Sequence, residues 1–288
     1  MLKKRLLFGT LMTIAFAAIV LLDGWLDGAI TKSPADDKPI QATLLAILVA
    51  VLAIPAQQEM SKLAAARGVK TLTFFAIIAS ILLATAPYLH QFVKIPPQIS
   101  TNFLLFLTIF GLFYCHYARF GIAGTIVNCG ATSFAIIYLG ILSSFALAIR
   151  LDFGLWPFLM TIFTVKSSDI GAYTIGSAFG KHKFSPKISP GKTWEGMAGA
   201  TAAAVVVAIL FAALCGIMSY WLAAIFGICL AFAGQLGDLA ESLLKRDAEQ
   251  KDSSSSVPGF GGILDVIDSP LGAMPVAYIF LLFTRHCV

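Results

Sequence analysis

The chain has 288 residues, of which 58% are hydrophobic and 12% are charged, and its mean hydropathy is +0.87. A soluble domain cannot bury that much apolar surface, so the composition excludes a soluble globular protein. The apolar stretches are continuous rather than alternating, which excludes a membrane β-barrel. We therefore predict an all-α, polytopic integral membrane protein.

Charge-free runs predict about nine transmembrane helices, each near the ~20 residues that a spanning helix needs. In chain order, the predicted spans are 6–22, 40–56, 71–89, 99–116, 121–148, 153–170, 196–218, 221–236 and 269–283. The sixth span is the least apolar, because Lys166 and Asp169 lie near its end. The Asp-rich loop from Asp23 to Asp37, which includes Asp27, is interpreted as a solvated outer loop.

Three parts follow from this order. Residues 1–120 are predicted to form an N-terminal transmembrane scaffold, 121–152 a connecting transmembrane helix, and 153–288 a C-terminal catalytic transmembrane domain. The connecting helix is rich in Gly and Ala, which permits close packing within the chain and also a contact in a homodimer.

The distribution of Lys and Arg predicts the orientation. If the N-terminus, with Lys3, Lys4 and Arg5, is cytoplasmic, the loops on that side carry most of the cationic residues. The long polar loops 171–195 and 237–268 then face the cytoplasm. We therefore expect a multi-pass protein of the inner cell membrane with both of these loops inside.

The first of these loops combines lysines with turn-forming residues. Its candidate substrate-binding groups are Lys181, Lys187, Ser189, Gly191 and Lys192. Backbone amides in Ser- and Gly-containing turns cradle phosphate oxygens while lysines supply positive charge, which favours a polyphosphate or lipid-headgroup pocket. The alternative is a basic loop that meets anionic lipid only through its charge.

The second loop concentrates the charge of the chain. Ten of the 35 charged residues lie between Asp238 and Asp268, bracketed by charge-free stretches. Helical spacing places Asp238, Glu241 and Lys245 on one stripe, and Asp265 lies one turn before Asp268. Oxygen ligands without Cys or His favour Mg²⁺. The alternative is a solvated loop whose ends carry helix-capping Asp residues.

At these residues the sequence resembles the phosphatidate cytidylyltransferase (CDP-diacylglycerol synthase) family. The signature residues are Ser242, Lys245-Arg246, Lys251-Asp252, Gly261-Gly262, Asp265 and Asp268, and a second stretch runs from Ser189-Pro190-Gly191-Lys192 to Gly196, with Asp169 and Gly171-Ala172-Tyr173 as its lead-in. Two positions depart from the family form, because Phe260 stands where His is common and Val266 where Arg is common. Any catalytic role at those two positions is therefore in doubt.

The resemblance implies that CTP and phosphatidic acid give CDP-diacylglycerol and diphosphate, with Mg²⁺ as cofactor. It implies that Asp238, Asp265 and Asp268 bind the metal, with Glu241 either as an additional ligand or as a residue that contacts the ligands without binding the metal. Lys192, Lys245 and Arg246 would balance charge on the nucleotide and on the departing diphosphate. Ser189 and Ser242 would donate hydrogen bonds to phosphate oxygens, and Asp169 would orient a lysine, join the metal site or simply be solvated at a helix end.

The expected partners are CTP, phosphatidic acid and membrane lipids, and we expect no nucleic acid. A CTP-dependent transferase that acts on an ether lipid or a polyprenol remains an alternative. A secondary transporter of an anionic solute is a further one, but it predicts an inverted repeat between the two halves. The polar residues of this chain are concentrated in the second half instead.

Overall fold

The structure is a computed structural model that describes residues 2–31, 36–254, 256–257 and 261–284, with the backbone alone for 2–7. Within these ranges all regular elements are helices, and the only β-type pairings are two isolated bridges. The prediction of an all-α protein is confirmed. Phe260, one of the two departures from the family signature, lies outside the described residues, as do the side chains of the N-terminal cationic residues 3–5.

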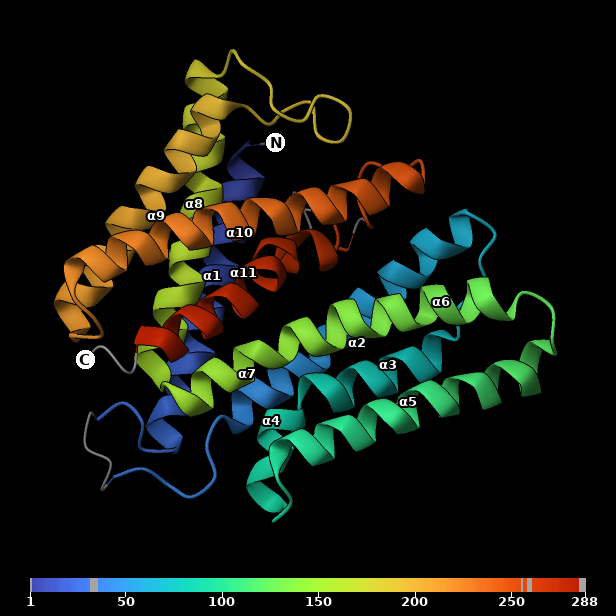
Figure 1. Cartoon of the computed structure of the whole chain (residues 1–288). Helices are drawn as coiled ribbons and strands as arrows, with labels where there is room; N and C mark the ends of the chain where they lie inside the picture. The colour runs from blue at the N-terminus through green and yellow to red at the C-terminus, as the bar shows by residue number, and fades with distance from the viewer. Residues whose placement is uncertain (1, 32–35, 255, 258–260, 285–288) are drawn as a thin grey trace. The chain divides into compact units, whose positions relative to one another are not determined.

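Eleven α-helices follow one another along the described chain (Figure 1). They are α1 (Leu2–Leu26), α2 (Thr43–Ala66), α3 (Thr73–Ala84), α4 (Ala86–Leu89), α5 (Pro97–Phe120), α6 (Thr125–Ile136), α7 (Leu142–Asp152), α8 (Leu155–Phe179), α9 (Trp194–Cys215), α10 (Tyr220–Asp247) and α11 (Leu264–Thr284). A 3₁₀-helix, η1 (His90–Phe92), follows α4, and a π-helix, η2 (Ile137–Ile141), joins α6 to α7.

Seven described helices are long and apolar enough to cross a membrane, counting α6 to α7 as one, and the bent pair formed by α3 with 86–92 makes an eighth. The predicted total of nine is therefore too high by this criterion. The predicted sixth span, 153–170, accounts for the difference between nine and eight. It corresponds to α8, which is 25 residues long but is not among the seven helices. Lys166, Asp169 and the neighbouring serines lower its hydropathy, although a helix of that length, about 37 Å, still matches the thickness of a bilayer.

The chain divides into two compact units. The first consists of residues 1–151 with 247–266, and the second of residues 152–246 with 267–288. The predicted division into scaffold, connecting helix and catalytic segment concerns function and stays a prediction.

In the first unit, α3 packs on α6 and η2 through small side chains. Ala76 and Ala79 of α3 form a buried cluster with Leu83 and with Ile136 of α6. Helix α3 also contacts α2 and α5, α6 contacts α2 and α5, and α1 contacts α2.

In the second unit, α8 and α9 lie side by side over most of their length (Figure 1). The start of α9 is fixed by Thr193, whose Oγ1 accepts a hydrogen bond from the Gly196 N–H at 3.1 Å. This side-chain cap satisfies one of the N–H groups that have no partner at a helix start. It also fixes the point at which the loop 180–193 joins the helix.

The interpretation of Asp23 and Asp27 as members of a solvated loop is wrong. Both side chains are buried in the first unit, where Arg150 Nη2 lies 2.6 Å from Asp27 Oδ2 and 3.7 Å from Asp23 Oδ2. Asp23 also accepts a hydrogen bond from the Leu44 N–H, and Asp27 from the Ala42 N–H, at the start of α2. A buried arginine between two carboxylates ties α1, α2 and α7 together.

Candidate functional site

Three carboxylates meet in the second unit. Asp238 and Glu241 of α10 and Asp268 of α11 each bring one oxygen atom within 4.8 Å of the others. The two on α10 are adjacent because residues three apart share a helix face. Glu241 is fully buried, Asp268 is buried, and Asp238 is half-buried. This group is therefore enclosed by protein rather than spread over an exposed surface.

The close approach of α10 and α11 explains this convergence. A Cβ added to Gly237 would lie 2.4 Å from the backbone oxygen of Asp268, and a Cβ added to Gly272 would lie 2.7 Å from the Gly237 Cα. No larger residue fits at this crossing. Because Asp238 directly follows Gly237, the crossing places its side chain beside the first turns of α11.

Two lysines accompany the acidic group. Lys192 Nζ lies 3.0 Å from Asp238 Oδ2 and donates a hydrogen bond to the Gln235 backbone oxygen at 3.2 Å. Lys245, one turn after Glu241 on α10, forms an ion pair with it. Both lysines are largely shielded from solvent, at 11% and 10% side-chain exposure, so their attraction to the carboxylates is less screened than at a surface. Three negative and two positive groups thus share one small volume.

The loop 180–193 is folded so that Lys192 reaches this group. Lys183 and Thr193 form a β-bridge, and the Trp194 N–H donates to the His182 oxygen at 2.9 Å. Glu195 accepts hydrogen bonds from the backbone N–H groups of Lys181 and His182, which fixes the entry to the loop.

The other predicted loop residues have different positions. Lys181, Lys187 and Gly191 are exposed, and Ser189 is half-buried, with its backbone oxygen accepting the Lys192 N–H at 3.1 Å. Arg246 is exposed and donates from Nε to the Ile188 oxygen at 3.2 Å. Arg246 therefore holds the loop from the end of α10.

The remaining two predicted residues of this unit are on α10 and α8. Ser242 is buried and donates a hydrogen bond from Oγ to Asp238 Oδ1 at 3.2 Å. Asp169 pairs with Lys166 one turn earlier on α8, with 3.3 Å between Oδ2 and Nζ. Of the three possibilities given for Asp169, this contact corresponds to orientation of a lysine.

Asp265 lies in the first unit. Its Oδ2 accepts hydrogen bonds from the Ser253 N–H at 3.0 Å, from Ser253 Oγ at 2.7 Å and from the Gly262 N–H at 2.7 Å. Among the described residues, the carboxylates close enough to share one ion are Asp238, Glu241 and Asp268. Glu241, which the sequence indicated only as an additional ligand, is thus a full member of the group.

Sequence reasoning missed Glu59, a buried residue of α2 that accepts four hydrogen bonds from 253–264. A signal was present, because Glu59 is the only carboxylate between Asp37 and Asp152 and lies in an apolar helix. Ionisable residues in such helices mark functional positions by default.

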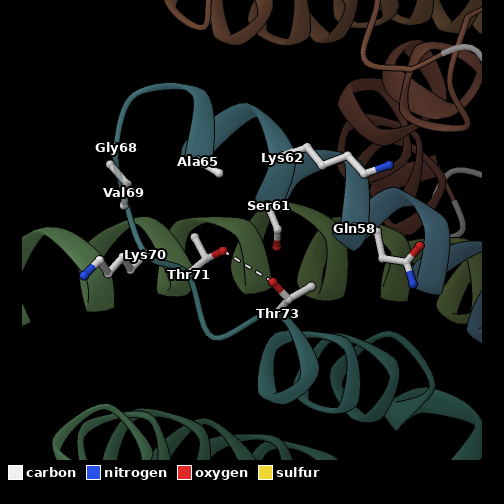
Figure 2. A pocket seen from close by; sticks show the side chains of 9 residues that line it. All are labelled: Gln58, Ser61, Lys62, Ala65, Gly68, Val69, Lys70, Thr71 and Thr73. Carbon is white, nitrogen blue, oxygen red and sulfur yellow. Dashed lines mark hydrogen bonds between the residues drawn. The ribbon is translucent and has the colours of Figure 1, made fainter. Parts of the chain in front are cut away.

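A separate hollow in the first unit has a different character (Figure 2). Hydroxyl groups of Ser61, Thr71 and Thr73 line its centre, whereas the amines of Lys62 and Lys70 point to opposite sides, away from one another. The two lysines of this hollow do not converge in the structure, and the residues that line it include no carboxylate. The acidic group in the second unit is therefore the better candidate for nucleotide chemistry.

The donor set of that group fits Mg²⁺. Carboxylate oxygens are the ligands that this hard cation prefers, and bringing three carboxylates together is unfavourable unless cations lie among them. Asp238, Glu241 and Asp268 supply the oxygens, and the half-buried Asp238 leaves access from one side.

Fold and site together define a polytopic helical membrane protein with an enclosed group of carboxylates on two apolar helices, α10 and α11. A sequence model of the Cytidylyltransferase family matches residues 38–284. The chain belongs to this family, and it is therefore an enzyme of the CTP-dependent nucleotidyltransferase class.

Curated relatives agree with the family assignment. The chain is 30% identical to a phosphatidate cytidylyltransferase of Chlamydia muridarum over 86% of each chain. It is 41% identical to a protein of the same name from Bacillus subtilis, over 54% of this chain and 60% of the relative. A Haemophilus influenzae protein of that name is 42% identical, over 45% of this chain and 47% of the relative. The match to the last two thus spans about half of their length.

Proposed function

We propose that this chain is a phosphatidate cytidylyltransferase, which converts CTP and phosphatidic acid to CDP-diacylglycerol and diphosphate. The observation that carries the proposal is the enclosed group of Asp238, Glu241 and Asp268 with Lys192 and Lys245, in a chain whose named relatives share that activity. The same relatives do not favour the alternatives, a transferase acting on an ether lipid or a polyprenol and a transporter of an anionic solute.

In this proposal Mg²⁺ is bound by Asp238, Glu241 and Asp268, and Asp265 remains a proposed ligand on the strength of the family signature. When held by these residues, the ion would supply positive charge against the phosphates of CTP. Several ligands of Mg²⁺ are usually water and substrate phosphate, so a small number of carboxylates suffices.

The lysines have a defined task in the reaction. An oxygen of the lipid phosphate forms a bond to the α-phosphorus of CTP, and the bond from that phosphorus to the bridging oxygen of the β-phosphate breaks. Lys192 and Lys245 pair with carboxylates in the structure, and we propose that they move onto phosphate oxygens in the reaction, together with Arg246. Such transfers depend on alignment and charge stabilisation.

The same reaction gives roles to two hydroxyl groups and does not need a proton acceptor. Ser242, bonded to Asp238, and Ser189 are proposed to donate hydrogen bonds to phosphate oxygens, with Lys181, Lys187 and Gly191 at the outer side of the loop. A phosphate monoester is already largely ionised at neutral pH, so no general base is needed.

The proposed location is the inner cell membrane, with the N-terminus and both site-bearing loops in the cytoplasm. Its support is the distribution of Lys and Arg together with the supply of CTP from that side. A homodimer through 121–152 also stays a proposal. The lipid substrate keeps its acyl chains in the bilayer while its phosphate meets CTP at the interface.

The direct test uses the full chain purified in detergent, supplied with labelled CTP, phosphatidic acid and Mg²⁺. We expect a lipid-soluble product that contains cytidine, and its formation should stop on chelation of the metal. The rate of product formation is then compared with that obtained when a polyprenyl phosphate or an ether-linked analogue replaces phosphatidic acid, which shows which lipid is preferred. Failure to form any cytidine lipid, with uptake of an anionic solute by vesicles that contain the protein, would overturn the proposal.

A further inference from the structure

We propose that Glu59 is a positioning residue, whose carboxylate holds the Gly-Gly turn that carries Asp265 and sets the start of α11. The inference rests on the proposed function, because Asp265 is a proposed ligand of Mg²⁺. All residues that carry the argument belong to the first compact unit.

The contacts of Glu59 are divided evenly between its two oxygens. Oε1 accepts hydrogen bonds from Ser254 Oγ at 2.6 Å and from the Ile263 N–H at 3.1 Å. Oε2 accepts from Ser253 Oγ at 3.0 Å and from the Leu264 N–H at 2.9 Å. One carboxylate thus joins both ends of the segment 253–264.

The environment of Glu59 requires these bonds. Its exposed fraction is 2%, and among the described residues no Lys, Arg or His lies within ion-pair distance of it. A buried carboxylate without a cation is stable in its charged form only when several donors replace its water. The four neutral donors supply that replacement, so the loop and the carboxylate depend on each other.

Glu59 also acts as a helix cap from a distant part of the chain. The N–H groups of Ile263 and Leu264 lie at the start of α11, where helical N–H groups have no partner within the helix. A negative group at this end also interacts favourably with the helix dipole. Glu59 therefore determines where α11 begins and how its first turn is oriented.

Ser253 connects this cap to Asp265. Its Oγ lies 3.0 Å from Glu59 Oε2 and 2.7 Å from Asp265 Oδ2. A hydroxyl group has one proton to donate, so the two carboxylates share this donor and the position of one affects the other. A change at Glu59 is thereby transmitted to Asp265 through a single side chain.

At both glycines of the turn, a side chain would collide with neighbouring atoms. A Cβ added to Gly262 would lie 2.0 Å from Ser253 Oγ and 2.3 Å from Glu59 Oε2. Gly261 has a φ of +106°, and a Cβ there would lie 2.6 Å from Asp265 Oδ2. The backbone of the turn is pressed against both carboxylates, which explains why this part of the signature contains two glycines.

The test compares Glu59→Gln with Glu249→Gln in the full-length protein. The glutamine at 59 keeps one accepting oxygen but places an NH₂ group against two donors, whereas Glu249 is an exposed residue paired with Arg67 in the same unit. Binding of Mg²⁺ without substrates is measured by isothermal titration calorimetry, and turnover is measured separately. We expect the Kd for Mg²⁺ to rise about tenfold or more in Glu59→Gln and to stay unchanged in Glu249→Gln.

A second pair of variants separates positioning from folding. Ser254→Ala removes one donor to Oε1 without touching Asp265, and Ser253→Ala removes the shared donor. Ser253→Ala should raise the Kd for Mg²⁺. In the double variant with Glu59→Gln, the factor by which the Kd rises should be smaller than the product of the two single factors, because both changes act on the same contact between Glu59, Ser253 and Asp265. Ser254→Ala should lower the unfolding temperature with little change in the Kd.

Two outcomes overturn the inference. One is a folded Glu59→Gln protein with the Kd for Mg²⁺ and the turnover of the wild type. The other is multiplicative weakening by Glu59→Gln and Ser253→Ala. Failure of the proposed function is distinguished by the wild-type protein itself, which would then give no cytidine lipid from phosphatidic acid.

Discussion

The acidic residues of the second unit give a direct mutational prediction. Asp238→Asn and Asp268→Asn should each lower turnover about 100-fold or more, because each removes a charged, pre-positioned group from the proposed metal site. The measurement is the initial rate of cytidine-lipid formation at saturating CTP and Mg²⁺.

Asp247→Asn is the matched control for these two variants. Asp247 ends α10, its side chain is 68% exposed, and its ion pair with Arg67 is 3.6 Å long. Exposed pairs contribute little, so this variant should keep wild-type turnover. Equal rates in all three variants would contradict the metal assignment.

At the level of single residues, the sequence predicts which side chains lie together only when they are close to one another along the chain. Asp238, Glu241 and Lys245 could be placed on one helix face from their spacing alone. The family signature added both Asp265 and Asp268, but of these two only Asp268 is in the described group of carboxylates with Asp238 and Glu241. The role of Glu59 could not be predicted, since its partners Ser253 and Ser254 lie almost 200 residues further along the chain.

At the level of helices, the crossing of α10 and α11 should be intolerant of added volume. Gly237→Ala places a methyl group 2.4 Å from the Asp268 backbone oxygen, so the helices must separate. We expect a lower unfolding temperature in detergent and a large loss of turnover, because Asp238 and Asp268 move apart. Gly216→Ala, whose Cβ would meet nothing within 4 Å, should retain turnover even though its positive φ strains the backbone.

The buried ion cluster of α1, α2 and α7 yields a stability prediction. Arg150→Met leaves Asp23 and Asp27 buried without a cation, and breaking such a cluster typically destabilises by about 3–5 kcal/mol. The thermal unfolding midpoint of the purified protein should fall clearly. Adding Asp23→Asn and Asp27→Asn to this variant should recover part of the loss, and the exposed Arg119→Met should show none.

Helix α8 shows why the count of spans could not be read from hydropathy alone. Its length was predicted in outline by the apolar run 153–170, but the helix continues to Phe179 through residues that a charge-free window excludes. Lys166 and Asp169 form an ion pair within this helix at 3.3 Å, so their charges partly compensate each other. Such local pairing is not visible in an averaged hydropathy value.

For the whole molecule, membrane orientation can be measured by labelling single cysteines in a cysteine-free background. Lys183→Cys, in the loop between α8 and α9, should react with a membrane-impermeant maleimide only from the cytoplasmic side. Lys94→Cys, between η1 and α5, should react only from the opposite side, because the Lys and Arg distribution places these loops on different faces. The same face for both would contradict the proposed orientation.

The class of protein was predictable at this scale because composition alone excludes a soluble fold. The division into units was not, since residues 247–266 join the first unit although they follow the whole of 152–246 in the chain. The hydrogen bonds from Ser253 and Ser254 to Glu59 are part of what attaches that segment. Contacts between such distant stretches leave no periodic signal in a single sequence.

This discontinuity has a consequence for biosynthesis. Glu59 leaves the ribosome long before its four donors, so the first unit cannot be completed until nearly all of the polypeptide has been translated. During that interval its carboxylate must be solvated or held by the insertion machinery. A polypeptide truncated after α9 would therefore lack all four of these donors, and the Glu59 carboxylate in its second helix would need other partners.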